Sequence, residues 1–229
     1  MPTVQKTSSR MQLLAALLAG ACLSLVICRL EGFDIGAAVS KLVASSIFIA
    51  VACLSGAMRS SYGRLIFLGL VCSWFGDMFL LGESRPFFLA GLVSFLLAHA
   101  AYIAAFSVHG MSDRWTLSAL LPVALISLLV TAWLAPFLPA DMVMPVRAYT
   151  FVISLMVITA FGARGAGATA LIPLGATLFY FSDLSVASMQ FTRPTFPSYI
   201  WGLPFYYTGQ LMLAMSIAFV IKEEQGEYE

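Results

Sequence analysis

Long apolar segments follow one another along almost the whole chain, and they constrain its fold more than any other feature of the sequence. A helix that crosses the roughly 30 Å hydrocarbon core of a bilayer needs about 20 predominantly apolar residues. Segments of this kind lie at residues 11–29, 36–57, 65–82, 86–107, 115–135, 142–162, 167–190 and 200–221. They are too long and too continuous for the alternating pattern of a membrane β-barrel. We therefore predict an all-α, polytopic integral membrane protein, a bundle of eight transmembrane helices that forms a single domain over residues 1–229.

The composition excludes several other classes of protein. Of the 229 residues, 61% are hydrophobic and 10% are charged, whereas a soluble domain carries about 25% charged residues. Soluble enzymes, disordered tails and nucleic-acid binders all need more polar surface than this chain offers. The net charge of +1 provides no field that would attract a polyanion. We expect the bilayer and its lipids as partners, and no nucleic acid.

Eight spans place both chain ends on the same side of the membrane. Lys and Arg are more frequent on the cytoplasmic side of membrane proteins. The side of the chain ends carries Lys6, Arg10, Arg59, Arg64, Arg114, Arg164 and Lys222, whereas the opposite side carries Arg29, Arg85 and Arg193. We therefore expect both termini in the cytoplasm and the protein in a bacterial inner membrane. Residues 11–29 are expected to remain as the first helix instead of being removed as a signal peptide.

The sequence aligns with itself at an offset of 106 residues. Residues 41–81 then match 147–187 without a gap, and ten of the 41 pairs are identical. Asp77 falls on Asp183, and Lys41 falls on Arg147. Apolar composition alone explains some aliphatic matches but not the pairing of rare charged residues. The offset indicates a 4+4 internal duplication with parallel halves, which would let the two aspartates face each other at equal depth.

Four ionisable residues lie well inside the predicted spans: Lys41, Asp77, Arg147 and Asp183. A charge at the centre of a transmembrane helix costs about 2.5–3.5 kcal/mol on insertion scales, so such residues point to function. At 1.5 Å per residue, all four are expected within roughly the outer 8–12 Å of the hydrocarbon layer. The structural alternative is a pair of buried ion pairs, or cations that extend to the interface.

Other polar residues fall on helical faces. His99 lies near mid-membrane in its span, with Tyr102 one turn later, although a lone histidine of this kind is often only a hydrogen-bonding bridge between helices. Tyr207 and Gln210 share a face of the last span, although Tyr206 and Tyr207 also fit an aromatic belt at the membrane interface. No nucleophile elbow, HExxH zinc motif or phosphate-binding loop is present.

Four motifs occur in order along predicted spans three to eight. They are Ser73-Trp-Phe-Gly-Asp77, Gly91-Leu-Val-Ser-Phe-Leu-Leu-Ala-His99-Ala-Ala-Tyr102, Phe179-Tyr-Phe-Ser-Asp183 and Tyr206-Tyr-Thr-Gly-Gln210. With these motifs the chain resembles the YhhN-like membrane proteins, the lysoplasmalogenase family. Lys41 and Tyr149 also match positions typical of that family, and the resemblance extends over spans two to eight.

The resemblance implies hydrolysis of the vinyl-ether bond of a lysoplasmalogen, a lysophospholipid, to a fatty aldehyde and a glycerophospho-ethanolamine or -choline, without a cofactor. Such a bond is hydrolysed by protonation at carbon, and two carboxylates can divide the roles of proton donor and stabilising anion. We predict this pair to be Asp77 and Asp183, with His99 also in the catalytic group. The substrate would be bound by residues that orient it or hold its phosphate: Lys41, Arg147, Tyr102, Tyr149, Tyr207 and Gln210.

Two other functions are compatible with the same residues. Internal repeats with paired charges inside the membrane also describe ion-coupled transporters of small molecules or lipids. Asp77, His99 and Asp183 could instead hold a metal ion in a metal-dependent intramembrane lipid hydrolase. No local ligand motif supports the metal site.

Overall fold

The computed structural model describes residues 2–192 and 194–226, and over these residues it contains helices and no strand. The eight long helices are α1 (Pro2–Leu30), α2 (Asp34–Leu54), α3 (Ser61–Phe79), α4 (Arg85–His109), α5 (Asp113–Leu134), α6 (Val143–Gly165), α7 (Leu171–Ala187) and α8 (Tyr199–Glu224). Short helical turns extend or connect them: η1 (Ala57–Arg59), η2 (Ala135–Phe137), η3 (Ala140–Met142) and η4 (Ser188–Thr192). The predicted all-α bundle is therefore confirmed.

Seven of the helices in the described residues are long and apolar enough to cross a membrane. The exception is α3, a helix of 19 residues that carries both Arg64 and Asp77. These two charges lower its hydropathy, so the predicted count of eight spans is one higher than the number of helices that qualify by length and composition. α3 packs against α2, α4 and α8, and it is therefore an integral part of the bundle. The protein is a multi-pass integral membrane protein.

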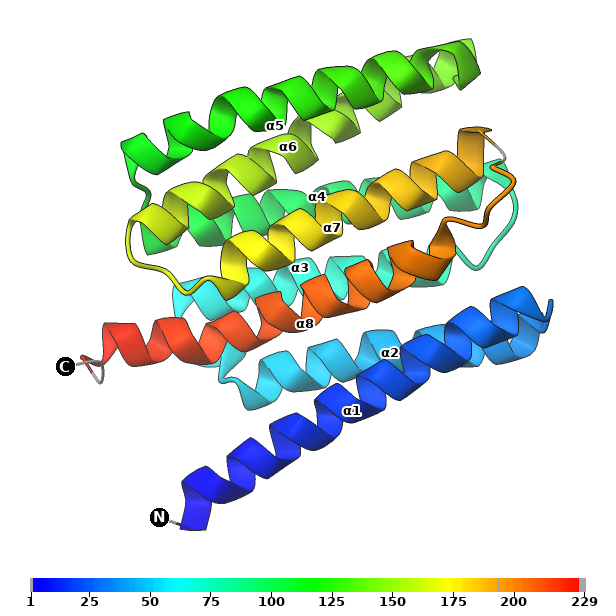
Figure 1. Cartoon of the computed structure of the whole chain (residues 1–229). Helices are drawn as coiled ribbons and strands as arrows, with labels where there is room; N and C mark the ends of the chain where they lie inside the picture. The colour runs from blue at the N-terminus through cyan, green and yellow to red at the C-terminus, as the bar shows by residue number, and fades with distance from the viewer. Residues whose placement is uncertain (1, 193, 227–229) are drawn as a thin grey trace.

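Successive helices run antiparallel, and both termini lie at the same end of the bundle (Figure 1). Arg193 and the side chain of Lys6, which entered the orientation argument, lie outside what the structure describes. The connections between the helices are short. The turn between α6 and α7 contains Gly167, whose φ of 114° suits a residue without a side chain.

The packing partners of the helices agree with a duplicated chain. Each half contains two hairpins, α1–α2 with α3–α4 and α5–α6 with α7–α8, and the two helices of every hairpin pack closely. The fourth helix of each half also packs against the second helix of the other half, α8 against α2 and α4 against α6. In Figure 1, α4, α7 and α8 lie in the middle of the bundle and α1 and α5 lie at its outer edges.

α5 is the helix most exposed on the outside of the bundle. Among the large side chains that it presents outward are Leu117, Leu121 and Leu128, which are 65%, 77% and 69% exposed. Polar residues would cover such a face in a soluble protein, whereas lipid chains are as apolar as leucine. The face is therefore suited to contact with lipid.

α7 and α8 approach so closely that glycine is required on both helices. A Cβ atom added at Gly175 would lie 2.9 Å from the backbone oxygen of Gly209, and one added at Gly209 would lie 2.8 Å from the backbone oxygen of Gly175. Small residues at helix contacts allow this kind of approach in membrane bundles. The contact fixes α8, which carries Tyr206, against α7, which carries Asp183.

We expect Gly175→Ala and Gly209→Ala each to destabilise the protein by about 1–3 kcal/mol, because the new methyl groups would meet backbone atoms that cannot turn away. The measurement is thermal unfolding of the purified protein in detergent. Gly20→Ala is the matched control, because nothing lies within 4 Å of a Cβ at that position of α1. An unchanged unfolding midpoint in both α7 and α8 variants would contradict the proposed close contact.

Candidate active site

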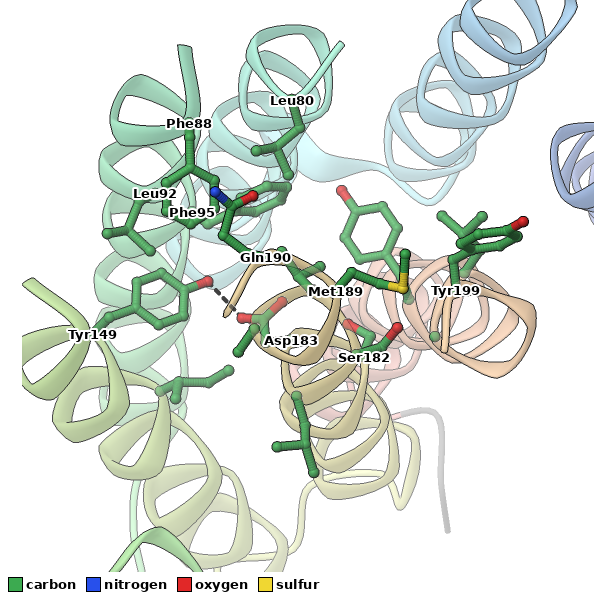
Figure 2. A pocket seen from close by; sticks show the side chains of 18 of the residues that line it. Leu80, Phe88, Leu92, Phe95, Tyr149, Ser182, Asp183, Met189, Gln190 and Tyr199 are labelled. Carbon is green, nitrogen blue, oxygen red and sulfur yellow. Dashed lines mark hydrogen bonds between the residues drawn. The ribbon is translucent and has the colours of Figure 1, made fainter. Parts of the chain in front are cut away.

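A cavity of about 340 Å³ lies toward the end of the bundle opposite the two termini, and all eight helices contribute to its lining. One side of the lining is polar, where Arg29, Lys41 and Asp77 lie. Apolar residues also line the cavity, among them Val130 and Leu134 of α5 on the far side from α1 and α2. Figure 2 shows the part of the cavity around Asp183. A cavity with one charged side and one apolar side suits an amphipathic ligand.

Asp77 is held by donors on both of its carboxylate oxygens. The Lys41 Nζ atom lies 3.4 Å from Oδ1. The Ser45 hydroxyl donates to Oδ2 at 2.6 Å, and the Tyr206 hydroxyl donates to the same atom at 2.7 Å. Asp77 and Lys41 are 3% and 6% exposed. Because a buried charge requires a partner and hydrogen bonds, these contacts favour an ionised Asp77 in an ion pair with Lys41.

Asp183 has a different set of partners. The Tyr149 hydroxyl donates to its Oδ2 atom at 2.5 Å, and the His99 Nε2 atom lies 3.3 Å from that oxygen and 2.9 Å from the Tyr149 hydroxyl. Figure 2 shows the contact between Tyr149 and Asp183. Within the described residues, the Oδ1 atom of Asp183 has no hydrogen bond. One oxygen of this carboxyl group is therefore free to act on a ligand in the cavity.

Aromatic rings separate the surroundings of the two aspartates. The rings of Phe95, Phe179 and Tyr206 contact one another with centroids 5.3–6.0 Å apart. The His99 ring in turn lies 4.7 Å from that of Phe179. No hydrogen bond joins the two carboxyl groups in the described part of the chain. Asp77 and Asp183 nevertheless line the same cavity, as expected for residues that act on one ligand.

Each aspartate is held in the same way by helices of both halves. Asp77 of α3 contacts Lys41 and Ser45 of α2 and Tyr206 of α8. Asp183 of α7 contacts Tyr149 of α6 and His99 of α4. In both cases the partners come from the second helix of the same half and the fourth helix of the other half. This arrangement agrees with the internal duplication, although the partners are chemically different.

Arg147 was predicted to join the charged layer, but the structure places it elsewhere. Val146, Tyr149, Thr150 and Ile153 of α6 line the cavity, and their spacing of three and four residues defines one face of the helix. Arg147 follows Val146 by one residue, which rotates its side chain by about 100° away from that face. It is exposed and does not line the cavity. Of the four charged residues expected around one site, Lys41, Asp77 and Asp183 line the cavity, and Arg147 does not.

Three predicted substrate-binding residues lie behind the cavity lining. Tyr102, Tyr207 and Gln210 are at most 1% exposed and do not line the cavity. The Tyr102 hydroxyl donates to Gln210 Oε1 at 2.8 Å. The Tyr207 hydroxyl lies 3.4 Å from Ser45 Oγ, and Ser45 contacts Asp77. Tyr207 is thus connected to the site through Ser45, whereas Tyr102 and Gln210 are bonded to each other behind the lining.

Three residues of the site were not identified from the sequence. Ser45 is a small residue in an apolar span, and nothing in the sequence distinguishes it from the other serines. Tyr206 resembled a residue of the interface belt but is buried and bonded to Asp77. Arg29 resembled a loop charge at the end of α1 but lines the cavity beside Lys41. Its position at the same end of the bundle as Lys41 was the available signal.

The structure does not gather the residues proposed for a metal site. His99 contacts Asp183 but not Asp77, whose partners are Lys41, Ser45 and Tyr206. Within the residues that the structure describes, no group of three His, Cys, Asp or Glu side chains is placed to hold a metal ion. The set of Asp77, His99 and Asp183 is therefore not a ligand set in this arrangement.

Comparisons with known proteins agree with the motifs. Residues 36–217 match the YhhN family. The chain is 34% identical over 157 residues to lysoplasmalogenase TMEM86A of Homo sapiens, with 66% of this chain and 64% of that protein covered. It is 29% identical over 171 residues to lysoplasmalogenase TMEM86B of Homo sapiens, with 72% and 71% covered. The chain thus spans about 64% of the length of the TMEM86A relatives that it matches. No solved structure matches the chain.

We expect Lys41→Met to destabilise the protein by about 3–5 kcal/mol, because the substitution leaves the buried Asp77 carboxylate without its cation. The measurement is denaturant unfolding in detergent micelles. Arg147→Met is the matched control, and its effect should stay within about 0.5 kcal/mol because this side chain is exposed.

A double variant, Lys41→Met with Asp77→Leu, separates the loss of the pair from the loss of packing. It should regain most of the stability, because both buried charges are removed together. If Lys41→Met and Arg147→Met had the same free energy of unfolding, the prediction that the Lys41–Asp77 ion pair stabilises the fold would be wrong.

Proposed function

The chain belongs to the YhhN family, and on this premise we propose that it is a lysoplasmalogenase. This enzyme would hydrolyse the vinyl-ether bond of a lysoplasmalogen and release a fatty aldehyde and a glycerophospho-ethanolamine or -choline. The observation that carries the proposal is a single cavity, charged on one side and apolar on the other, that is lined by both Asp77 and Asp183. The names of the relatives support it, because the proteins to which the chain is similar over 157 and 171 residues are named as lysoplasmalogenases.

The two sides of the cavity suit the two ends of a lysophospholipid. Arg29 and Lys41 provide two positive charges that can attract a phosphate group, while Asp77 balances one of them. The apolar side, which includes Leu134 and Ile153, offers a surface for one hydrocarbon chain. The substrate would then lie with its headgroup toward α1 and α2 and its chain toward α5 and α6, so that the ether bond falls between them.

The chemistry requires a proton donor, an anion and a water molecule. A vinyl ether is hydrolysed when its β-carbon is protonated, which creates an oxocarbenium ion that water captures. The resulting hemiacetal then breaks down to the aldehyde and the alcohol. Paired carboxyl groups support a similar oxocarbenium-like state in glycoside hydrolysis. Asp77 and Asp183 are proposed to serve in the same way here, and His99 and Tyr149 hold Asp183 in place.

Three residues are proposed to act on the site from behind. The predicted role of Tyr102, Tyr207 and Gln210 in orienting the substrate becomes a supporting one, because they are buried behind the lining. Tyr207 contacts Ser45, which in turn donates to Asp77. Supporting hydrogen bonds of this kind fix the orientation of the groups that contact the ligand.

The orientation of the protein has a consequence for the substrate. If the termini lie in the cytoplasm of a bacterial inner membrane, as the distribution of Lys and Arg supports, then the cavity lies toward the outer side of that membrane. The substrate would then enter from the outer leaflet.

We expect the purified protein to release aldehyde from a lysoplasmalogen but not from the matching alkyl-ether lysolipid. The saturated ether has no double bond to protonate, so the proposed reaction cannot begin. Asp77→Asn and Asp183→Asn should each lower the rate at least about 100-fold, as expected when a positioned acid or stabilising anion is removed. The measurement is aldehyde formation over time in detergent or in liposomes.

Arg147→Asn provides the control, because it removes a charged side chain from outside the cavity. Correct folding of every variant is checked by its elution in gel filtration. Equal rates with the vinyl ether and the alkyl ether would contradict the proposed chemistry. Full activity of either aspartate variant would contradict the role of the carboxyl pair.

We expect Arg29→Ala to raise KM about tenfold while leaving kcat nearly unchanged. A phosphate contact far from the breaking bond contributes equally to substrate and transition-state binding, and its loss therefore appears in KM. Steady-state kinetics with a lysoplasmalogen test this, and Arg147→Ala is the matched control. An unchanged KM in Arg29→Ala would remove this residue from the headgroup site.

A further inference from the structure

We propose that the two aspartates have fixed and different roles, in which Asp183 delivers the proton to the β-carbon of the vinyl ether and Asp77 remains an anion that stabilises the oxocarbenium ion. This inference rests on the proposed lysoplasmalogenase function. It is carried by the different hydrogen-bond partners of the two carboxyl groups.

Both carboxylate oxygens of Asp77 already face donors. The Lys41 Nζ atom faces Oδ1, and the hydroxyl groups of Ser45 and Tyr206 both donate to Oδ2. All three partners are donors, and Lys41 carries a positive charge. Protonation of Asp77 would therefore remove the charge that Lys41 pairs with and place the new proton close to the hydrogen of a donor.

Asp183 has the opposite properties. Its partners are the Tyr149 hydroxyl and the His99 imidazole, and both lie within hydrogen-bonding distance of Oδ2. Within the described residues it has no ion pair with Lys or Arg. Its side chain is 15% exposed, compared with 4% for Asp77. The free Oδ1 atom can therefore carry a proton toward the cavity.

The proton and the electrons can be followed through each step. The Asp183 carboxylic acid gives its proton to the β-carbon, where the electron pair of the C=C bond forms the new C–H bond. The α-carbon and the ether oxygen then share a positive charge, which the Asp77 carboxylate faces. Water adds to the α-carbon and loses a proton to Asp183. The hemiacetal breaks its bond to the glycerol oxygen, which takes up the hydroxyl proton, and the aldehyde is released.

Tyr149 and His99 are positioning residues in this scheme. They hold Oδ2 and thereby direct Oδ1 into the cavity. The Tyr149 hydroxyl also stabilises the Asp183 carboxylate that forms once the proton has left, because donors lower the free energy of a carboxylate more than that of the neutral acid. His99 does the same in the tautomer that carries its proton on Nε2.

The assignment predicts which limb of the pH–rate profile each of two variants moves. Activity requires a charged Asp77, which sets the acidic limb, and a protonated Asp183, which sets the basic limb. Tyr149→Phe removes one donor from Asp183, and Tyr206→Phe removes one donor from Asp77. Each change makes the affected carboxylate easier to protonate. Tyr149→Phe should therefore move only the basic limb, and Tyr206→Phe only the acidic limb, each toward higher pH by about one unit.

The measurement is kcat/KM for aldehyde release from a choline lysoplasmalogen, whose quaternary ammonium group does not titrate. The uncatalysed acid hydrolysis of the substrate is subtracted at each pH. His99→Asn and Ser45→Ala provide a second pair of variants in case a tyrosine variant does not fold. They remove one contact from Asp183 and one from Asp77, and they should move the basic and the acidic limb respectively.

The outcomes distinguish this inference from the function on which it rests. If the limbs are exchanged between the two variants, Asp77 is the proton donor and the assignment is overturned. If neither variant moves a limb, the pair does not control the titration and the assignment is also overturned. An absence of aldehyde release by the wild-type protein would instead overturn the lysoplasmalogenase function itself.

Discussion

The buried ion pair between Lys41 and Asp77 is the interaction on which the rest of the site depends. A single charge inside an apolar bundle is costly, and a pair is tolerated only when its remaining hydrogen-bonding capacity is satisfied. Asp77 meets this condition with Ser45 from α2 and Tyr206 from α8. The pair thus links α2, α3 and α8, and it requires α8 to lie where its tyrosine reaches the carboxylate. The glycine contact between α7 and α8 then sets α7, and with it Asp183, relative to this pair.

The two halves of the chain hold their aspartates with equivalent helices but with different side chains. The second helix of one half and the fourth helix of the other half hold an aspartate in both cases, but only Asp77 has a cation beside it. The residue that corresponds to Lys41 is Arg147, which faces outward, and Tyr149 takes its place beside Asp183. The partner from the fourth helix is Tyr206 for Asp77 and His99 for Asp183. A duplication followed by these exchanges would convert two equal carboxylates into two unequal ones.

The sequence predicted the depth of residues in the membrane better than the direction in which their side chains point around the helix axis. Hydropathy located the eight helices, and the rise per residue placed Lys41, Asp77 and Asp183 near one level. The direction of a side chain around a helix axis is harder to predict, because the lipid-facing side of a membrane bundle is as apolar as its interior. Arg147 was therefore assigned to the site, and Tyr206 resembled an interface residue. The cavity itself depends on how all eight helices pack, which no local pattern of residues describes.

The unequal surroundings of the aspartates suit a reaction that creates positive charge in a medium of low dielectric constant. In the proposed first step, a neutral acid and a neutral ether become a carboxylate and an oxocarbenium ion, so the total charge of the site does not change. The new carboxylate already accepts a hydrogen bond from Tyr149 and lies beside the His99 imidazole, and the new cation faces an anion that is present beforehand. Both charges thus form next to groups that are already oriented, which avoids the reorganisation that water would require. A site with two equivalent carboxylates would lack this order, because either one could hold the proton.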